Sequence, residues 1–290
     1  QSMGLFVFGL FFAGVFLFIE GRHPQPVIDP VLFRSRLFTI NLITGFLVFI
    51  GLGSGVLIPF YLEIVLGYSV QQVGFLLAVL PISLGITAPI SGTLSDRVGS
   101  RPISVLGLAV TALGYFALAT LRTDTTAAGF MLRYLPIGIG VGLFQSPNNA
   151  AMMSTAPRER LGVASGLLAI TRSLGQTVGI AVLGAFWAAM VFRASGGPVP
   201  GGATLASAEA QTAGLRAVSL GAAGLMVLGL GIALVAWRDE RRRPRRENRR
   251  QAAQEARTPR SQGRRPPRVR QPEGRPHPDF DSVASSSGRT

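Results

Sequence analysis

Long uncharged runs, rather than alternating polar and apolar positions, dominate the first 237 residues of the chain. Helices of water-soluble proteins carry a polar stripe with a period of about 3.6 residues, and these runs have none, which argues against a very apolar soluble bundle. A helix needs about 20 apolar residues to cross the hydrocarbon core of a bilayer. Runs of about that length predict an all-α integral membrane protein with seven transmembrane helices, at residues 1–19, 37–62, 70–95, 103–121, 134–156, 161–192 and 217–237.

Charge is scarce and unevenly distributed. Charged residues make up 14% of the chain, against about 25% in ordinary soluble domains. Residues 238–290 hold 16 of the 28 arginines and 7 of the 14 acidic residues, so they carry +9 of the formal net charge of +14. The other 237 residues share the remaining 19 charges, too few to cover a surface that faces water.

The distribution of arginine predicts the orientation of the helices. Residues 20–36, 96–102 and 157–160 are richer in arginine than residues 63–69 and 122–126, and arginine is enriched in cytoplasmic loops. Residues 238–290, rich in Arg, Pro, Gln and Ser, are expected to be a disordered cytoplasmic tail. Its arginines next to the last span predict contact with anionic lipid; nucleic acid is not expected, because no aromatic residues are interleaved with them.

The composition excludes several kinds of catalytic site. There is no Cys, so disulfides and thiolate metal sites are excluded. The only histidines, His23 and His277, are far apart, which argues against a histidine zinc site, a Ser-His-Asp triad or a lipid-handling membrane enzyme. We therefore expect no catalytic residues, no metal and no cofactor: the chain is not expected to be an enzyme.

Glycine and proline recur inside the spans. The chain has 36 glycines, among them Gly138-Ile-Gly140-Val-Gly142 and Gly175-x-x-x-Gly179, with Gly184 beyond. Small residues let helix backbones approach each other closely in lipid. The pattern predicts close helix packing and, with the prolines in the spans, bending helices that move against one another.

The most specific stretch lies between the third and fourth spans and reads Gly92-Thr-Leu-Ser-Asp96-Arg97-Val-Gly99-Ser-Arg101-Pro102. Asp96 is expected near the start of a helix that begins around Pro102, where the helix dipole favours a carboxylate. Arg97 and Arg101 offer it partners, and Gly99 permits a tight turn. A plain solvated loop that is positively charged is the alternative.

Polar residues inside the spans are candidates for a cavity or for coupling. Arg172 is predicted at mid-membrane, where a charge costs at least about 2.5–3.5 kcal/mol, so it should face the bundle interior, as part of a structural pair or of a gate. Gln145 and Asn149 share a helix face with Asn148 adjacent; the three either bind substrate or join helices. Glu63, near the outer surface, is either interfacial or a proton carrier. No Asp or Glu lies deep in a span, so the main carboxylate of a proton relay is expected outside this chain.

The stretch G-x-L-x-D-R-x-G-x-R resembles the signature loop of the major facilitator superfamily, a family of secondary transporters. The resemblance implies that Gly92, Asp96, Arg97, Gly99 and Arg101 form a charge lock between helices, which is made in one access state and broken in the other. Ser100 departs from the usual basic residue, which implies a weaker lock. Further stretches are similar to the fourteen-helix drug:proton antiporter branch, at residues 32–38, 59–69, 136–143, 157–166 and 172–179.

The resemblance implies a partial major-facilitator bundle, namely the eighth to fourteenth helices of a multidrug efflux antiporter whose N-terminal half is missing here. Residues 1–19 are then an accessory helix, 20–36 a cytoplasmic linker, 37–237 a six-helix bundle and 238–290 the tail. The expected function is export of small amphipathic molecules or drugs, with antibiotic resistance, in exchange for protons at the plasma (inner) membrane. Phe144 and Met152 are candidate cavity residues. An exporter or facilitator of one endogenous metabolite and a non-transporting membrane scaffold are the alternatives.

Overall fold

The computed structural model describes residues 30–257, with side chains from 32 to 239, and isolated positions between 4 and 18. The chain divides into two compact units, residues 1–243 and residues 244–290. The predicted accessory helix at 1–19, apart from those isolated positions, and the tail beyond 257 lie outside the described residues. The features below belong to the first unit unless stated.

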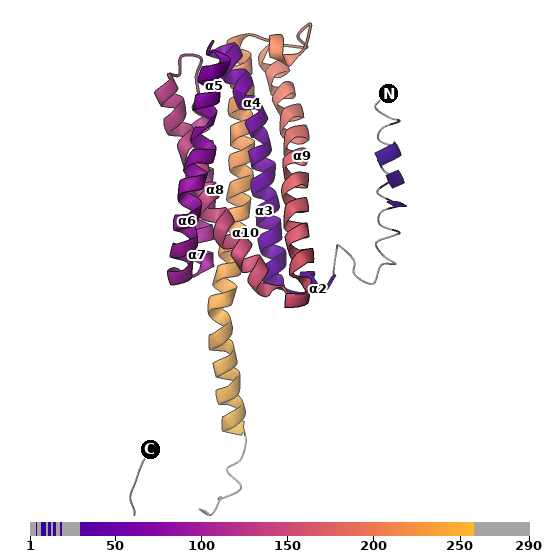
Figure 1. The fold of residues 1–290 in the computed structure, drawn as a ribbon, viewed down its shortest axis with the longest axis vertical. Coiled ribbons are helices and arrows are strands. Elements are labelled where there is room, and N and C mark those ends of the chain that lie inside the picture. The colour runs from indigo at the N-terminus through magenta and orange to yellow at the C-terminus, as the bar shows by residue number, and fades with distance from the viewer. Residues whose placement is uncertain are drawn as a thin grey trace, which may run out of the picture. The chain divides into compact units, whose positions relative to one another are not determined.

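The described residues form helices joined by short connections (Figure 1). The elements are α2 (Pro30–Phe33), α3 (Arg36–Gly53), η1 (Ser54–Val56), α4 (Leu57–Phe60), the π-helical turn η2 (Tyr61–Val65), α5 (Val70–Leu77), α6 (Val79–Val98), α7 (Ser100–Leu118), α8 (Ala127–Thr155), η3 (Arg158–Arg160), α9 (Leu161–Ala194), η4 (Ala203–Leu205) and α10 (Ala208–Arg257).

Six stretches of the described chain are long and apolar enough to cross a membrane. They are Arg36–Val65, Val70–Val98, Ser100–Leu118, Ala127–Thr155, Arg158–Ala194 and Ala208–Asp239. They coincide with six of the seven predicted spans and confirm the all-α membrane fold.

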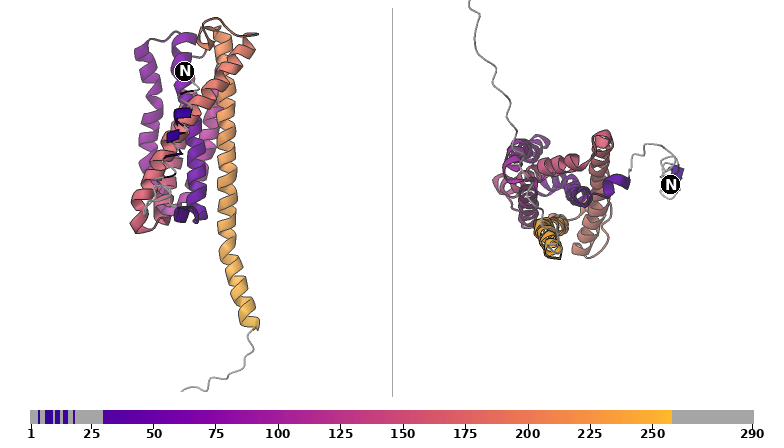
Figure 2. Two further views of the ribbon diagram at one scale, coloured as in Figure 1. Left: turned by 90° about the vertical axis from the view of Figure 1, so that its right-hand side faces the viewer. Right: turned by 90° about the horizontal axis from the view of Figure 1, so that it is seen from below.

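Successive spans run in opposite directions along the bundle (Figures 1 and 2). The start of α3, the junction of α6 with α7 and the start of α9 therefore lie at one end. This end carries Arg34, Arg36, Arg97, Arg101, Arg158 and Arg160, and we call it the arginine-rich end. Residues 119–126 and 195–207 connect helices at the opposite end.

Glycines determine which helices pack most closely. On α8, a Cβ at Gly138 or Gly142 would run into Leu80 or Thr87 of the Val70–Val98 span, whereas a Cβ at Gly140 would run into Thr111 of α7. Two glycines four residues apart thus face α6, and the glycine between them faces α7. Gly175 and Gly179 of α9 lie in the same way against the backbone of α3, so the predicted close packing is present.

The six spans are unequally covered by the rest of the bundle. Only 17% of the Val70–Val98 window and 22% of the Arg158–Ala194 window are buried, whereas the other four windows are 39–50% buried. The exposed side chains are large and apolar, for example Ile82, Ile86 and Ile90 on α6. The helices α6 and α9 therefore present apolar faces that nothing in the described chain covers.

Several helices extend beyond the predicted spans. The helix α8 begins at Ala127 rather than at 134, and α10 begins at Ala208 rather than at 217. The predicted ends fell at charged residues, but Arg133 and Arg216 are accommodated in helical turns near the end of the bundle, where long side chains reach polar groups. The helix α10 also continues to Arg257, into the stretch expected to be a disordered tail. Its Arg, Glu and Ala residues favour helix, whereas Pro244 does not.

Candidate functional site

The junction of α6 and α7 is a one-residue turn rather than a loop. The helix α6 continues through Val98, Gly99 has φ +92° and ψ 152°, and α7 starts at Ser100. Asp96 therefore lies in the last turn of α6, and its expected place near the start of the next helix was wrong. The reason is that Gly99 adopts a backbone conformation reserved almost entirely for glycine, which reverses the chain within a single residue.

The charged residues of this junction point to different partners. Arg101 donates a hydrogen bond from Nη1 to Oδ1 of Asn41 on α3, at 3.4 Å. Asp96 and Arg97 are exposed, and neither side chain forms a hydrogen bond or ion pair among the residues that the structure describes. The junction is thus tied to α3 through Arg101, while Asp96 and Arg97 remain at the surface of the arginine-rich end.

Asn148 lies in the contact between α8 and α3. Its Nδ2 donates to the backbone oxygen of Asn41 at 3.3 Å, and Asn148 and Asn41 are only 3% and 5% exposed. Asn148 Oδ1 and Asn41 Nδ2 are buried without a hydrogen-bond partner. Gln145 and Asn149 are half-buried instead. The polar cluster therefore divides into a helix-joining residue, Asn148, and two more accessible residues.

Arg172 lies on an exposed part of α9, with its guanidinium 5.2 Å from the centre of the Phe49 ring. The expectation that it faces the interior of this bundle was wrong. The inner face of α9 is formed by small residues, Thr171, Gly175 and Gly179, whose neighbours on α3 leave no room for a guanidinium. Arg172 has an aromatic partner through a cation–π contact and is otherwise open to the surroundings of the bundle.

The remaining candidates lie apart from these residues. Phe144 and Met152, expected in a cavity, are 2% and 0% exposed and belong to hydrophobic cores. Glu63 is exposed in the π-helical turn η2, at the end of the bundle opposite Asp96. These accessible polar candidates come from three different spans. Glu63 lies in Arg36–Val65, Gln145 and Asn149 lie in Ala127–Thr155, and Arg172 lies in Arg158–Ala194.

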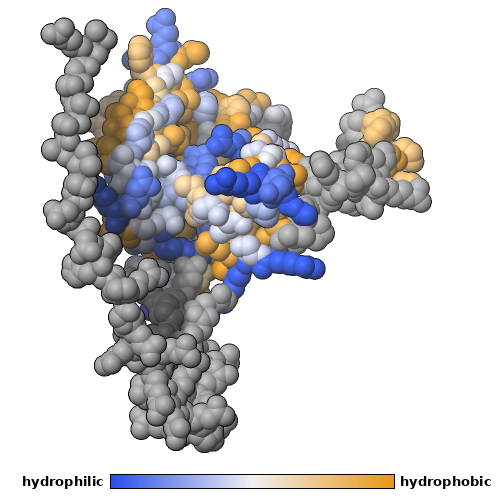
Figure 3. Space-filling view, turned by 60° about the horizontal axis from the view of Figure 1, so that its bottom comes forward, coloured by the Kyte–Doolittle hydropathy of each residue, from blue (hydrophilic) through white to orange (hydrophobic). Residues whose placement is uncertain are grey.

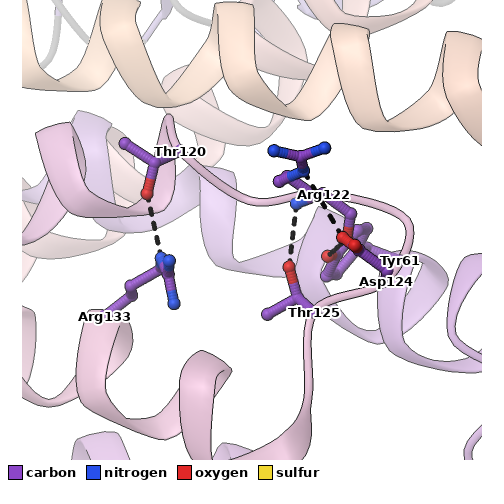
Figure 4. Close-up of polar contacts among 6 residues, drawn as sticks. All are labelled: Tyr61, Thr120, Arg122, Asp124, Thr125 and Arg133. Atoms are coloured by element: carbon purple, nitrogen blue, oxygen red, sulfur yellow. Dashed lines mark hydrogen bonds and ion pairs between the residues drawn. The ribbon is translucent and has the colours of Figure 1, made fainter.

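Sequence reasoning missed a polar network at the end of the bundle opposite the arginine-rich end. Tyr61 Oη donates to the backbone oxygen of Arg122 at 2.6 Å, and the backbone N–H of Arg122 donates to Thr125 Oγ1 at 2.8 Å. Figure 4 shows these residues beside Arg133, whose Nε donates to Thr120 Oγ1 at 2.9 Å. Tyr61 lies 61 residues from Arg122 in the chain, so no local pattern indicates this pairing.

Two further contacts at this end of the bundle join residues close in sequence, and the sequence does indicate them. Thr126 accepts a hydrogen bond from the backbone N–H of Gly129 at 3.1 Å and so caps the start of α8. The ion pair between Arg122 and Asp124, at 3.4 Å, is about three-quarters exposed on both sides and contributes little stability. Unlike these local contacts, the bond from Tyr61 joins segments that are distant in sequence. It therefore fixes the 119–126 connection to the Arg36–Val65 span.

Comparison with known families matches the profile of the Major Facilitator Superfamily to residues 2–180. This match covers more than half of the 290 residues. The chain belongs to the major facilitator superfamily. The matched region contains the α6–α7 junction, and the earlier resemblance is confirmed.

Several curated proteins are similar to more than half of this chain. The uncharacterized transporter YebQ of Escherichia coli (strain K12) is 38% identical over 55% of this chain and 35% of its own length. The multidrug transporter protein MdtP of Bacillus subtilis (strain 168) is 33% identical over 64% and 34%. The riboflavin transporter RibZ of Clostridioides difficile (strain 630) is 30% identical over 58% and 37%. The matched part thus spans about a third of each relative's length.

Proposed function

We propose that this chain is the C-terminal half of a secondary active transporter that exports small amphipathic molecules or drugs in exchange for protons. Membership of the superfamily and the relative named as a multidrug transporter support the proposal. The observation that carries it is the low burial of the Val70–Val98 and Arg158–Ala194 spans, at 17% and 22%. Exposed apolar faces of this kind are what a second helical bundle would cover in a transporter built from two halves.

In this proposal the substrate pathway runs between the two halves. Arg172, exposed on α9, and the half-buried Gln145 and Asn149 on α8 supply polar groups to it. Asn148 has no direct part, because it is buried against α3. Glu63 serves the opposite end of the bundle, and the proton-carrying carboxylate at depth belongs to the N-terminal half.

The α6–α7 junction is the proposed latch. Asp96 and Arg97 are exposed at the arginine-rich end, where charged groups of the N-terminal half can pair with them in one access state. Arg101 anchors the junction to Asn41 of α3, and Gly92 and Gly99 shape it. By the distribution of arginine, this end faces the cytoplasm, the 20–36 segment is a cytoplasmic linker and 238–290 a cytoplasmic tail of a plasma-membrane protein.

A chimera tests this function directly. The chain replaces the matched part of Bacillus subtilis MdtP, behind the N-terminal part of that relative, in a bacterial strain that lacks its own efflux pumps. We expect ethidium efflux that a protonophore abolishes, and its loss on Asp96→Asn. The matched control is Asp124→Asn, an exposed aspartate at the opposite end, which should leave efflux unchanged.

The outcomes separate the alternatives. A membrane-inserted chimera without efflux would favour a scaffold. Efflux that ignores the proton gradient would remove antiport, and unchanged efflux in Asp96→Asn would reduce the junction to a plain charged loop. Because one relative is named a riboflavin transporter, riboflavin is the second substrate to test: efflux of riboflavin without efflux of ethidium would favour a single-metabolite exporter.

A further inference from the structure

A cavity opens at the arginine-rich end, where the starts of α3 and α7 meet α10. It has a volume of about 290 Å³. Figure 3 shows this end of the bundle coming toward the viewer, with hydrophilic side chains gathered on it and hydrophobic ones at their border. The cavity is lined by Arg34, Ser35, Arg36, Leu37, Ile40, Arg101, Ala236 and Asp239.

The lining of this cavity is predominantly cationic. It contains three guanidinium groups, from Arg34, Arg36 and Arg101, and one carboxylate, from Asp239. Arg36 Nη2 lies 2.9 Å from Asp239 Oδ2, with the two side chains 55% and 44% exposed. Guanidinium groups remain charged at any physiological pH and match the geometry of phosphate oxygens. The lining therefore suits an anion that carries a phosphate.

An apolar groove of about 440 Å³ continues from this cavity along α3 and α10. It shares Arg36, Ile40 and Ala236 with the cavity, and its other lining residues are Leu228, Gly231, Ile232 and Val235. From Leu228 to Ala236 the helix rises by about 12 Å at 1.5 Å per residue. That is most of one leaflet of a hydrocarbon core about 30 Å thick.

Gly231 keeps this groove open. A Cβ at this position would meet no atom within 4 Å, so the glycine borders open space instead of a neighbouring helix. Leu228 and Val235, one turn away on either side, are 55% and 56% exposed. The groove therefore opens toward the lipid-facing surface of the bundle, and neither α6 nor α9 lines it.

We propose that the cavity and the groove together form one binding site for an anionic phospholipid. The phosphate lies among Arg34, Arg36 and Arg101, and an acyl chain lies in the groove beside Gly231. The excess of positive charge in the lining selects an anionic headgroup over a zwitterionic one, and the apolar groove selects a lipid over a soluble phosphate. Basic pockets between transmembrane helices are suited to such headgroups.

The site joins three helices at the membrane surface. Arg36 begins α3, Arg101 lies in the first turn of α7, and Asp239 lies on α10. A bound phosphate gives Arg36 a second anionic partner beside Asp239 and connects α7 to α3 and α10. Because binding to the folded state alone raises its stability, the lipid stabilises this end of the bundle.

The first experiment compares ligands on the purified full chain in detergent. Native mass spectrometry and thermal unfolding are measured with dioctanoyl phosphatidylglycerol, with dioctanoyl phosphatidylcholine and with inorganic phosphate. We expect one retained phosphatidylglycerol per chain and a raised Tm, with neither effect from phosphatidylcholine. Inorganic phosphate at millimolar concentration should not displace the bound lipid.

Paired variants locate the site. Gly231→Leu fills the groove without changing any charge and should weaken phosphatidylglycerol binding about tenfold, the effect of about 1.4 kcal/mol. Gly224→Leu is its control, because Gly224 lies on the same helix, also has open space at its Cβ and is outside the groove. Arg34→Gln should weaken binding by about tenfold, the scale of one charge-assisted hydrogen bond, whereas Arg158→Gln, at the same end but outside the cavity, should not.

Three results would overturn the proposal. Equal retention of phosphatidylglycerol and phosphatidylcholine would show that no anionic headgroup is selected. Displacement by inorganic phosphate would indicate a site for a soluble anion. Equal effects of Gly231→Leu and Gly224→Leu, in variants with wild-type circular dichroism, would show that the lipid lies elsewhere.

Discussion

The side-chain amide of Asn148 on α8 donates a hydrogen bond to the backbone carbonyl of Asn41 on α3, at 3.3 Å, while Oδ1 of Asn41 accepts from Arg101 of α7 at 3.4 Å. Asn41 thus receives hydrogen bonds from two other helices. This contact connects the α6–α7 junction to α3 and α8 inside the bundle.

Asn148→Ala should lower the stability of the bundle. The variant removes the hydrogen bond to Asn41 and leaves a void in a site that is 3% exposed, so we expect a loss of about 1 kcal/mol, the scale of interhelical hydrogen bonds in membranes. Gln145→Ala, a half-buried neighbour without this bond, is the control. Reversible unfolding in mixed micelles measures both; equal stabilities would contradict a helix-joining role for Asn148.

Two glycines of α9 should respond oppositely to the same substitution. Gly179→Ala pushes a methyl group against the backbone of Ile50 on α3, and overpacking of this kind costs about 1–3 kcal/mol. Gly184→Ala enters open space and should be neutral or stabilising by up to about 1 kcal/mol, because alanine favours helix. The same unfolding assay compares them, and an equal change at both positions would refute the close contact of α9 with α3.

Tyr61→Phe should loosen the connection between α7 and α8. It removes the hydroxyl that donates to Arg122 O at 2.6 Å, and a net hydrogen bond is worth about 0.5–1.5 kcal/mol. Hydrogen exchange of the backbone amides at 119–126 should become faster. Tyr68→Phe is the control, because the Tyr68 hydroxyl has no hydrogen bond to the residues that the structure describes; faster exchange in both variants would point to a general effect.

Gly99→Ala should destabilise the α6–α7 junction by about 1–3 kcal/mol, since φ +92° with ψ 152° is strained for any residue with a Cβ. Relief of this strain would displace Asp96 from its position relative to Arg101. In the chimera, efflux should fall along with stability. Gly85→Ala, in the span that precedes Gly99 and with open space at its Cβ, is the control that should preserve both.

The membrane fold could be predicted from the sequence because it depends on a local property, the length of uncharged runs. The ends of the helices could not, because a span was taken to stop at its first charge. Arg133 lies inside α8, where it reaches Thr120 Oγ1 and the backbone oxygen of Gly129 at 2.9 and 2.8 Å. An interfacial arginine of this kind ends a hydrophobic run without ending the helix.

The helix positions of the candidate residues could be predicted from the sequence, but the directions of their side chains could not. The spacing of four places Gln145 and Asn149 on one face of α8, but only the packing against α3 shows that Asn148 is the buried member of the cluster. The cost of a charge in lipid predicts that Arg172 needs shelter, and the structure gives it Phe49 at the edge of the bundle. Directions of this kind depend on contacts between segments far apart in the chain.

The alternating glycines of α8 have a mechanical consequence. Gly138 and Gly142 bring α6 against one side of α8, and Gly140 brings α7 against another, in each case with backbone atoms among the close neighbours. Helices in such close contact cannot slide past one another without steric overlap, so we expect these three helices to move as one rigid body. We therefore expect a displacement at Gly99 to move α6, α7 and α8 together.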